Sequence, residues 1–147
     1  MLEIKGRTVV ITGGATGIGF GIAKACGALG ANVVIGEPRQ KRLDEAVASL
    51  AELDVNACAF LLDVTDAEQF AQFADSAFTA FGDVALVVNN AGVGQQRGSV
   101  VDTAETEMQR VMAVNFQGVW RGCQLFGRRL IEQGTPAAIY NTGSENS

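Results

Sequence analysis

The sequence predicts one doubly wound α/β domain, in which helices cover both faces of a parallel sheet. Short apolar runs rich in β-branched residues alternate along the chain with segments of helical periodicity. These runs lack the strict polar alternation of half-exposed strands, as strands buried on both faces do. The 147 residues contain no linker, repeat or low-complexity tract and suffice for a single domain with its own core. We therefore expect right-handed crossovers and the strand order 3-2-1-4-5.

The first half of the chain contains two strand–helix pairs. Residues 7–12 form a β-branched run that ends in glycines and predicts the first strand. The helix predicted over residues 18–29 carries apolar residues on every face, as a helix buried against a sheet would. Residues 32–36 predict a second buried strand, and apolar residues then recur at helical spacing from Leu43 to Leu53.

The next strand and helix are predicted between residue 57 and Gly82. A third strand is expected over residues 57–62. Thr65 and Glu68 match a capping box, which predicts that Thr65 caps the following helix. The apolar stripe of this helix consists of Phe70, Phe73, Ala74, Ala77, Phe78 and Phe81. Gly82 ends the helix.

The last two strands frame a long helical stretch. The fourth strand is predicted over residues 84–88, and a loop rich in Gly and Gln follows it. A helical stretch then runs from about residue 103 to residue 133, where Gly134 and Pro136 end it. Residues 137–141 predict the fifth strand.

Composition excludes several classes of function. The net charge is −5, and the densest basic stretch, residues 39–42, is explained by a solvated helix start, so we expect no nucleic-acid partner. No apolar run could span a membrane and the first residues lack a signal-peptide core, so we expect a cytoplasmic protein. The absence of histidine excludes a Ser-His-Asp triad. Three widely spaced cysteines, Cys26, Cys58 and Cys123, indicate small buried residues and no metal site.

The loop between the first strand and the first helix carries the strongest motif, Thr12–Gly19. A strand that turns sharply into a helix whose amides face a pyrophosphate needs absent or small side chains. Gly13 suits the turn, Gly17 allows close approach, and Gly19 lets the helix pack on the strand. The strand–loop–helix context predicts a Rossmann-type dinucleotide site. A nucleoside-triphosphate loop is excluded because Phe20 stands where its lysine should be.

Glu37, at the end of the second strand, favours NAD over NADP. An acidic side chain there accepts hydrogen bonds from the ribose hydroxyls and repels the additional phosphate of NADP. Arg39 leaves NADP open, because its guanidinium could bind that phosphate. Thr16 adds no second basic contact. An exposed loop acid is the alternative explanation of Glu37.

Together these motifs resemble the short-chain dehydrogenase/reductase family. Thr12–Gly19 matches the family pattern Thr-Gly-x-x-x-Gly-x-Gly, and Asn89–Gly92 matches the motif that follows its fourth strand. Asp63 and Val64 resemble the pair that contacts adenine. The expected cofactor contacts are therefore Gly13, Thr16, Gly17, Ile18, Gly19, Glu37, Asp63, Val64, Asn90, Ala91 and Gly92. The resemblance implies catalytic roles for Asn115 and for Ser144, which follows Asn141-Thr142-Gly143.

Simpler explanations stay open for these residues. The asparagine pair before Ala91 could mark a turn. The amide of Asn115, expected in a partly buried helix position, needs a hydrogen-bond partner and could be structural. Ser144 could be an ordinary loop serine, and Ser147 is a rival with a less suitable offset.

The resemblance also implies a Tyr-x-x-x-Lys segment that these residues do not contain. The only tyrosine, Tyr140, lies in the fifth strand and is followed four places on by Ser144. We therefore expect residues 1–147 to be one cofactor-binding domain, truncated before that segment and inactive alone. The whole enzyme would transfer hydride between NAD, or NADP as the alternative, and a small alcohol or carbonyl substrate.

Other functions are disfavoured, and one expectation concerns assembly. A non-catalytic dinucleotide-binding module or redox sensor would need neither Asn115 nor Ser144. A sugar-nucleotide epimerase of the related extended branch would usually show the pattern Thr-Gly-x-x-Gly-x-x-Gly. Gly17 and Gly19 do not fit that spacing. By resemblance the long helix packs in a homo-oligomer, a dimer or a tetramer. Its residues Gly118, Gly122 and Gly127 would allow close helix approach but could equally serve packing inside the subunit.

Overall fold

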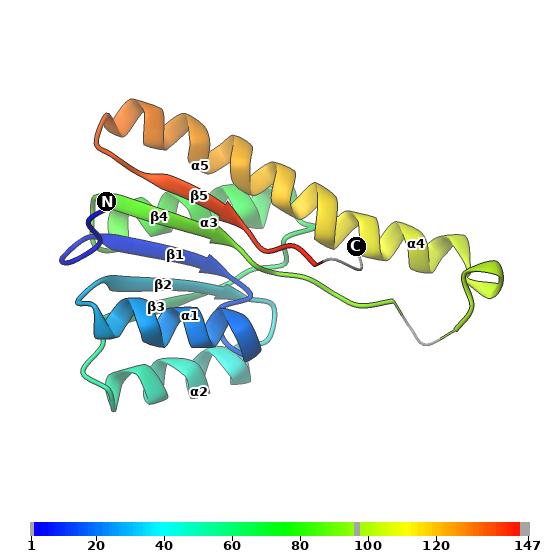
Figure 1. Ribbon diagram of the computed structural model, residues 1–147, viewed down its shortest axis with the longest axis horizontal. Coiled ribbons are helices and arrows are strands. Elements are labelled where there is room, and N and C mark those ends of the chain that lie inside the picture. The colour runs from blue at the N-terminus through cyan, green and yellow to red at the C-terminus, as the bar shows by residue number, and fades with distance from the viewer. Residues whose placement is uncertain (1, 96–97, 145–147) are drawn as a thin grey trace.

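The sheet is parallel and five-stranded, with the order β3-β2-β1-β4-β5 (Figure 1). The computed structural model describes residues 2–95 and 98–144. The strands are β1 Thr8–Thr12, β2 Asn32–Glu37, β3 Ala57–Leu61, β4 Val84–Asn89 and β5 Ala138–Asn141. The predicted fold class and strand order are confirmed, and the strand ends differ from the predicted ones by one residue at most.

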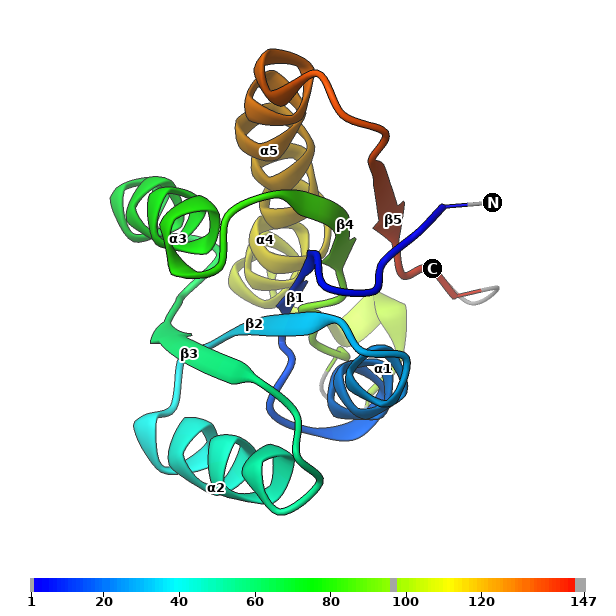
Figure 2. The same cartoon turned by 90° about the vertical axis from the view of Figure 1, so that its left-hand side faces the viewer.

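Helices cover both faces of this sheet (Figure 2). On one face lie α1, Gly17–Ala28, and α2, Gln40–Ala51. On the other lie α3, Ala67–Ala80, and α5, Val119–Gln133. The short α4, Glu105–Met112, joins α5 through the π-helical segment η2, Ala113–Gly118, and follows the 3-10 turn η1, Val100–Asp102.

The hydrophobic core forms two clusters, one on each face of the sheet. Alternate residues of β1 divide between them: Val9 and Ile11 pack with α1 and α2, whereas Val10 packs with α3 and α5. Four residues of the predicted α3 stripe, Phe70, Phe73, Ala74 and Ala77, are buried. Phe126 of α5 joins this cluster, and its ring lies 6.1 Å from that of Phe73 in an edge-on arrangement. The central strands are thus covered on both sides, which explains their lack of polar alternation.

One local prediction was wrong, and two helices are less buried than their apolar residues suggest. Asp66, not Thr65, caps α3 and accepts hydrogen bonds from the amides of Glu68 (2.9 Å) and Gln69 (3.0 Å). Only one side of α1 is buried, and Ile18 and Leu29 at its two ends are exposed. Leu53 is exposed because α2 ends at Ala51. Apolar character alone did not distinguish a helix buried all round from one covered on a single side.

The cysteines are not bonded to one another. Cys26 is buried and Cys58 is half-buried, and burial raises the pKa of both thiols. This agrees with the expected role of small packing residues for these two. None of the described helices is long and apolar enough to cross a bilayer.

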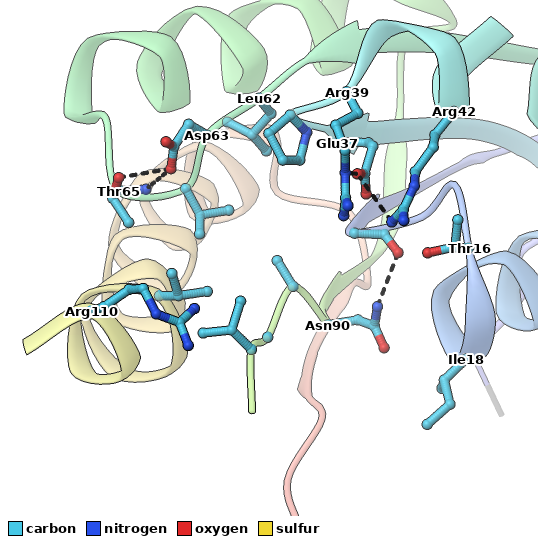
Figure 3. Close-up of a pocket in the computed structure, with 17 residues that line it drawn as sticks. Thr16, Ile18, Glu37, Arg39, Arg42, Leu62, Asp63, Thr65, Asn90 and Arg110 are labelled. Atoms are coloured by element: carbon cyan, nitrogen blue, oxygen red, sulfur yellow. Dashed lines mark hydrogen bonds and ion pairs between the residues drawn. The ribbon is translucent and has the colours of Figure 1, made fainter. Parts of the chain in front are cut away.

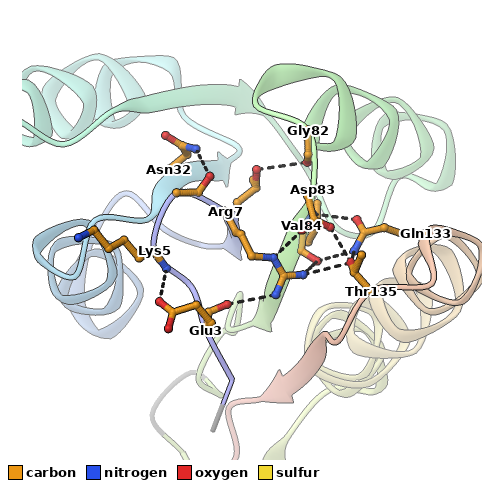
Figure 4. Close-up of polar contacts among 11 residues, drawn as sticks. Glu3, Lys5, Arg7, Asn32, Gly82, Asp83, Val84, Gln133 and Thr135 are labelled. Atoms are coloured by element: carbon orange, nitrogen blue, oxygen red, sulfur yellow. Dashed lines mark hydrogen bonds and ion pairs between the residues drawn. The ribbon is translucent and has the colours of Figure 1, made fainter.

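A polar brace joins three chain segments at the amino-terminal ends of the strands (Figure 4). Arg7 forms an ion pair with Asp83 over 2.6 Å, and its Nη2 atom donates to the Thr135 hydroxyl over 3.2 Å. The side-chain amide of Gln133 accepts from the Val84 amide (2.8 Å) and donates to the Val84 carbonyl (2.9 Å). The start of β1, the start of β4 and the turn before β5 are therefore tied together.

We expect this brace to make stability depend on pH. The hydrogen bond from Arg7 holds the pKa of the Asp83 carboxyl below its usual value, so the ionised form favours the fold. This contribution is present above the unfolded pKa of about 3.9 and is lost as pH falls through the lower folded value. In urea unfolding between neutral and acid pH, Asp83→Asn should be less stable than wild type at neutral pH and converge with it in acid. Asp44→Asn, at an exposed position of α2, controls for the lost charge. A constant gap down to the lowest pH would contradict this prediction.

Candidate cofactor site

A cleft of about 600 Å³ opens where β1, β2 and β4 end (Figure 3). The sheet order reverses between β1 and β4, and ligands of doubly wound folds bind at such a point. The predicted cofactor residues that line it are Gly13, Thr16, Ile18, Glu37, Asp63, Val64, Asn90, Ala91 and Gly92. Gly17, Gly19, Asn115 and Ser144 are not among its lining residues. The fold therefore brings together residues from four separate loops.

The glycine loop requires its glycines for different reasons. Gly13 and Gly17 have φ values of 64° and 54°, in the left-handed region that favours glycine. A Cβ at Gly19 would lie 2.2 Å from the Gly13 carbonyl oxygen, so Gly19 packs on the turn itself. A Cβ at Gly17 would meet nothing within 4 Å, which leaves room beside the helix start. Gly14 was not predicted as a site residue, yet a Cβ there would lie 2.6 Å from Cγ2 of Ile35.

The start of α1 is suited to an anion. Thr16 occupies the N-cap position, but its side chain makes no capping hydrogen bond. The first amides of a helix lack partners within the helix, and the helix dipole favours negative charge there. α3 differs, because Asp66 caps its amides. An uncapped helix start beside an open glycine loop fits a pyrophosphate group.

Asn90 and Thr12 join the loop after β4 to the glycine loop. The Thr12 hydroxyl accepts hydrogen bonds from the amides of Asn90 (3.0 Å) and Ala91 (3.1 Å). The Asn90 side chain donates to the carbonyls of Thr12 and Gly13, both over 3.2 Å. Asn90 therefore fixes the position of one loop against the other, which a plain turn asparagine would not do.

Asn89 connects the sheet to the long helix. Its side chain is buried and donates to Oδ1 of Asn141 on β5 over 2.8 Å. A Cβ at Gly122 would lie 2.0 Å from Oδ1 of Asn89, and one at Gly118 would lie 2.9 Å from Cγ2 of Val64. Both glycines thus serve packing within the subunit. A Cβ at Gly127 would meet nothing within 4 Å.

Glu37 is buried with two arginines beside it. Its side chain is 4% exposed, and Oε1 lies 2.8 Å from Nε of Arg39 and 3.8 Å from Nη1 of Arg42. The exposed-acid explanation is therefore wrong. Arg39 was predicted as a competing group, whereas Arg42 was not predicted as a partner of Glu37, since only the first turn of α2 brings it to the cleft. A buried carboxylate with two guanidinium groups is well compensated.

Asp63 and Val64 follow β3, the strand next to β2, and are held by their neighbours. Oδ1 of Asp63 accepts from the Thr65 amide (2.9 Å) and hydroxyl (2.7 Å). Thr65 thus orients this carboxylate, while Asp66 occupies the N-cap position of α3. The Val64 carbonyl accepts from Nη1 of Arg121 over 3.0 Å.

Asn115 and Ser144 lie outside the cleft lining. Asn115 is exposed, not partly buried as expected, yet its amide makes two hydrogen bonds of 2.9 Å with the Val93 backbone. Asn115 therefore has a structural role, because it holds the Val93 backbone. Ser144 is exposed and follows β5, where the Thr142 amide donates to the Asn89 carbonyl over 3.0 Å. Ser147 lies outside the described residues.

A family model described as short chain dehydrogenase matches residues 7–147. The chain belongs to this family. Among curated proteins, the chain is 40% identical over 140 residues to a probable oxidoreductase EphD of Mycobacterium tuberculosis (strain H37Rv), covering 95% of the chain and 24% of the relative. It is 33% identical over 144 residues to a C alpha-dehydrogenase of Sphingobium sp. (strain SYK-6), covering 98% of the chain and 47% of the relative.

Solved structures give the same result. A short chain dehydrogenase/reductase from Burkholderia phymatum, in complex with NAD, superposes with a TM-score of 0.93 at 33% identity. The match covers 98% of this chain and 51% of that one. The chain thus spans about half the length, or less, of these relatives.

Proposed function

We propose that this chain forms the dinucleotide-binding half of an NAD-dependent oxidoreductase acting on a small alcohol or carbonyl compound. The observation that carries the proposal is the open glycine loop at the uncapped start of α1, inside the cleft where the sheet order reverses. The complex of the Burkholderia phymatum protein with NAD supports the choice of ligand. When bound, the cofactor would supply the hydride acceptor or donor at its nicotinamide ring.

Each part of the cleft has a role in binding. The amides of Gly17, Ile18 and Gly19 would hold the pyrophosphate. Glu37 would accept hydrogen bonds from the adenosine ribose, and the carboxylate of Asp63 would lie near the adenine. We propose NAD over NADP because Glu37 presents a buried negative group, while Arg39 and Arg42 moderate this preference.

The catalytic step is proposed for the whole protein. Ser144 would orient the substrate oxygen by its hydroxyl, and Asn115 would act through the Val93 backbone that it holds. The tyrosine and lysine that the family pattern places after the serine are not among residues 1–147. The relatives compared above are dehydrogenases and oxidoreductases, which disfavours a non-catalytic module.

We expect the purified chain to bind NADH saturably. Titration followed by nicotinamide fluorescence should give a single site, and ADP-ribose should displace NADH because it carries the pyrophosphate and both riboses. Far-ultraviolet circular dichroism shows in parallel that the chain is folded. A folded chain that binds neither compound would overturn the proposal.

A further inference from the structure

Arg110 continues the sheet-facing side of the long helix beyond the end of the sheet. Residues four apart on this side are Arg110, Val114, Gly118, Gly122 and Phe126. Gly122 lies against Asn89, Gly118 lies against Val64, and Phe126 is fully buried. Val114 and Arg110 line the cofactor cleft. Arg110 thus brings a positive charge to the wall opposite Thr16 and Ile18 (Figure 3).

Glu107 holds the guanidinium of Arg110 in one orientation. Nε of Arg110 donates to Oε2 of Glu107 over 2.9 Å, and Nη2 donates to Oε1 over 2.8 Å. The Glu107 side chain is 14% exposed, whereas that of Arg110 is 42% exposed. A fork-to-fork pair of this kind fixes the plane of the guanidinium, which one hydrogen bond would not do.

The oriented guanidinium also binds the loop after β4. Nη2 of Arg110 donates to the Gly94 carbonyl over 2.9 Å. The preceding residue, Val93, is held by Asn115 through both its amide and its carbonyl. At the other end of this segment, Asn90 is held by Thr12 and Gly13. Residues 90–94 are therefore fixed from both sides, and residues 90–93 of this segment line the cleft.

We propose that Arg110, oriented by Glu107, is a positioning residue that holds this cleft wall ready for the dinucleotide. The proposal rests on the proposed function. With Arg110 in place, the backbone at residues 93 and 94 is ordered before the cofactor arrives. Without it, binding has to order the loop, and the cost of that ordering weakens affinity.

The decisive variant is Arg110→Met, which keeps the length of the side chain but removes every donor. We expect its NADH dissociation constant to rise about tenfold. This corresponds to the lower end of the range for a hydrogen bond to a charged group, because the site is partly exposed to solvent. Hydrogen exchange of the Val93 amide in the unliganded chain should become faster, and saturating NADH should restore its protection. Arg128→Met, on an exposed position of α5, removes the same charge away from the cleft and should change neither measurement.

Two further comparisons separate positioning from bulk charge. Glu107→Gln should reproduce part of the effect, and the double variant should lose less than the sum of the single losses because the two residues act together. Arg110→Lys keeps the charge but not the fork, so it should rescue only partly. A loss in Arg110→Met that disappears at high salt, with unchanged exchange, would show a diffuse electrostatic effect and overturn the proposal.

Failure of this inference is distinct from failure of the proposed function. If wild type binds NADH and Arg110→Met binds equally well, the inference fails and the function stands. If wild type does not bind NADH, the proposed function fails. The exchange measurement on the unliganded chain still tests whether Arg110 orders the backbone at residues 93 and 94. Faster exchange without any change in affinity would also overturn the positioning role.

Discussion

Gly19→Ala is expected to weaken NADH binding strongly. The added Cβ would lie 2.2 Å from the Gly13 carbonyl oxygen and 2.5 Å from Nδ2 of Asn90. One of these atoms belongs to the backbone, and the Asn90 amide is bonded to the same carbonyl, so neither yields without moving the loop. Relief of such a clash typically costs about 1–3 kcal/mol, and it shifts the start of α1, where the pyrophosphate would lie. We expect at least a tenfold rise in the NADH dissociation constant.

Gly21→Ala is the matched control for this experiment. It lies half a turn further along α1, and a Cβ there would meet nothing within 4 Å. Alanine is favoured over glycine inside a helix by roughly 0.5–1 kcal/mol, so this variant should be slightly more stable and bind NADH normally. Circular dichroism and urea unfolding show whether Gly19→Ala is still folded when its binding is measured. Normal affinity in a folded Gly19→Ala would mean that the loop has another conformation.

Glu37→Gln is expected to change the cofactor preference toward NADPH. The substitution removes the negative group that would repel a 2′-phosphate and that occupies Arg39 and Arg42. Each guanidinium would then be available to the phosphate, and a charge-assisted hydrogen bond is worth roughly 1.5–3 kcal/mol. The ratio of NADPH to NADH affinity should therefore rise on the order of a hundredfold.

Arg39→Gln provides the opposite change at the same place. It removes the nearer partner of Glu37, 2.8 Å away, and leaves Arg42 at 3.8 Å. The less compensated carboxylate should repel NADPH more strongly, so the preference for NADH should increase. Fluorescence titration with both cofactors at two salt concentrations measures each ratio. If both variants moved the ratio in the same direction, the ion pair would not control the choice of cofactor.

The sequence was sufficient for the fold because its main signals are local. The apolar strands, the α3 stripe and the glycines at positions 13 and 17 each follow from periodicity or from a backbone requirement at one place. Boundaries were less accurate where two polar residues competed. Thr65 and Asp66 can both cap a helix, and α3 begins at Ala67, which puts Asp66 in the N-cap position.

The site residues that were not predicted depend on contacts that the fold creates. Gly14 is required by Ile35 of a neighbouring strand, and Arg110 contacts Gly94 from the far side of a loop. Arg42 counts only because α2 begins beside Glu37. No spacing rule in a single sequence reports such contacts. Asn115 was identified by its family motif, but its bond to the Val93 backbone is visible only in three dimensions.

The brace of Arg7, Asp83, Gln133 and Thr135 lies at the opposite end of the strands from the cleft. Substitutions can therefore change the stability of the fold and the cofactor preference separately in this domain. Changes at the brace alter the free energy of unfolding while leaving the glycine loop in place. They are therefore the place to alter stability without changing the ligand. Changes at Glu37, by contrast, alter the preference between NAD and NADP and leave the brace unchanged.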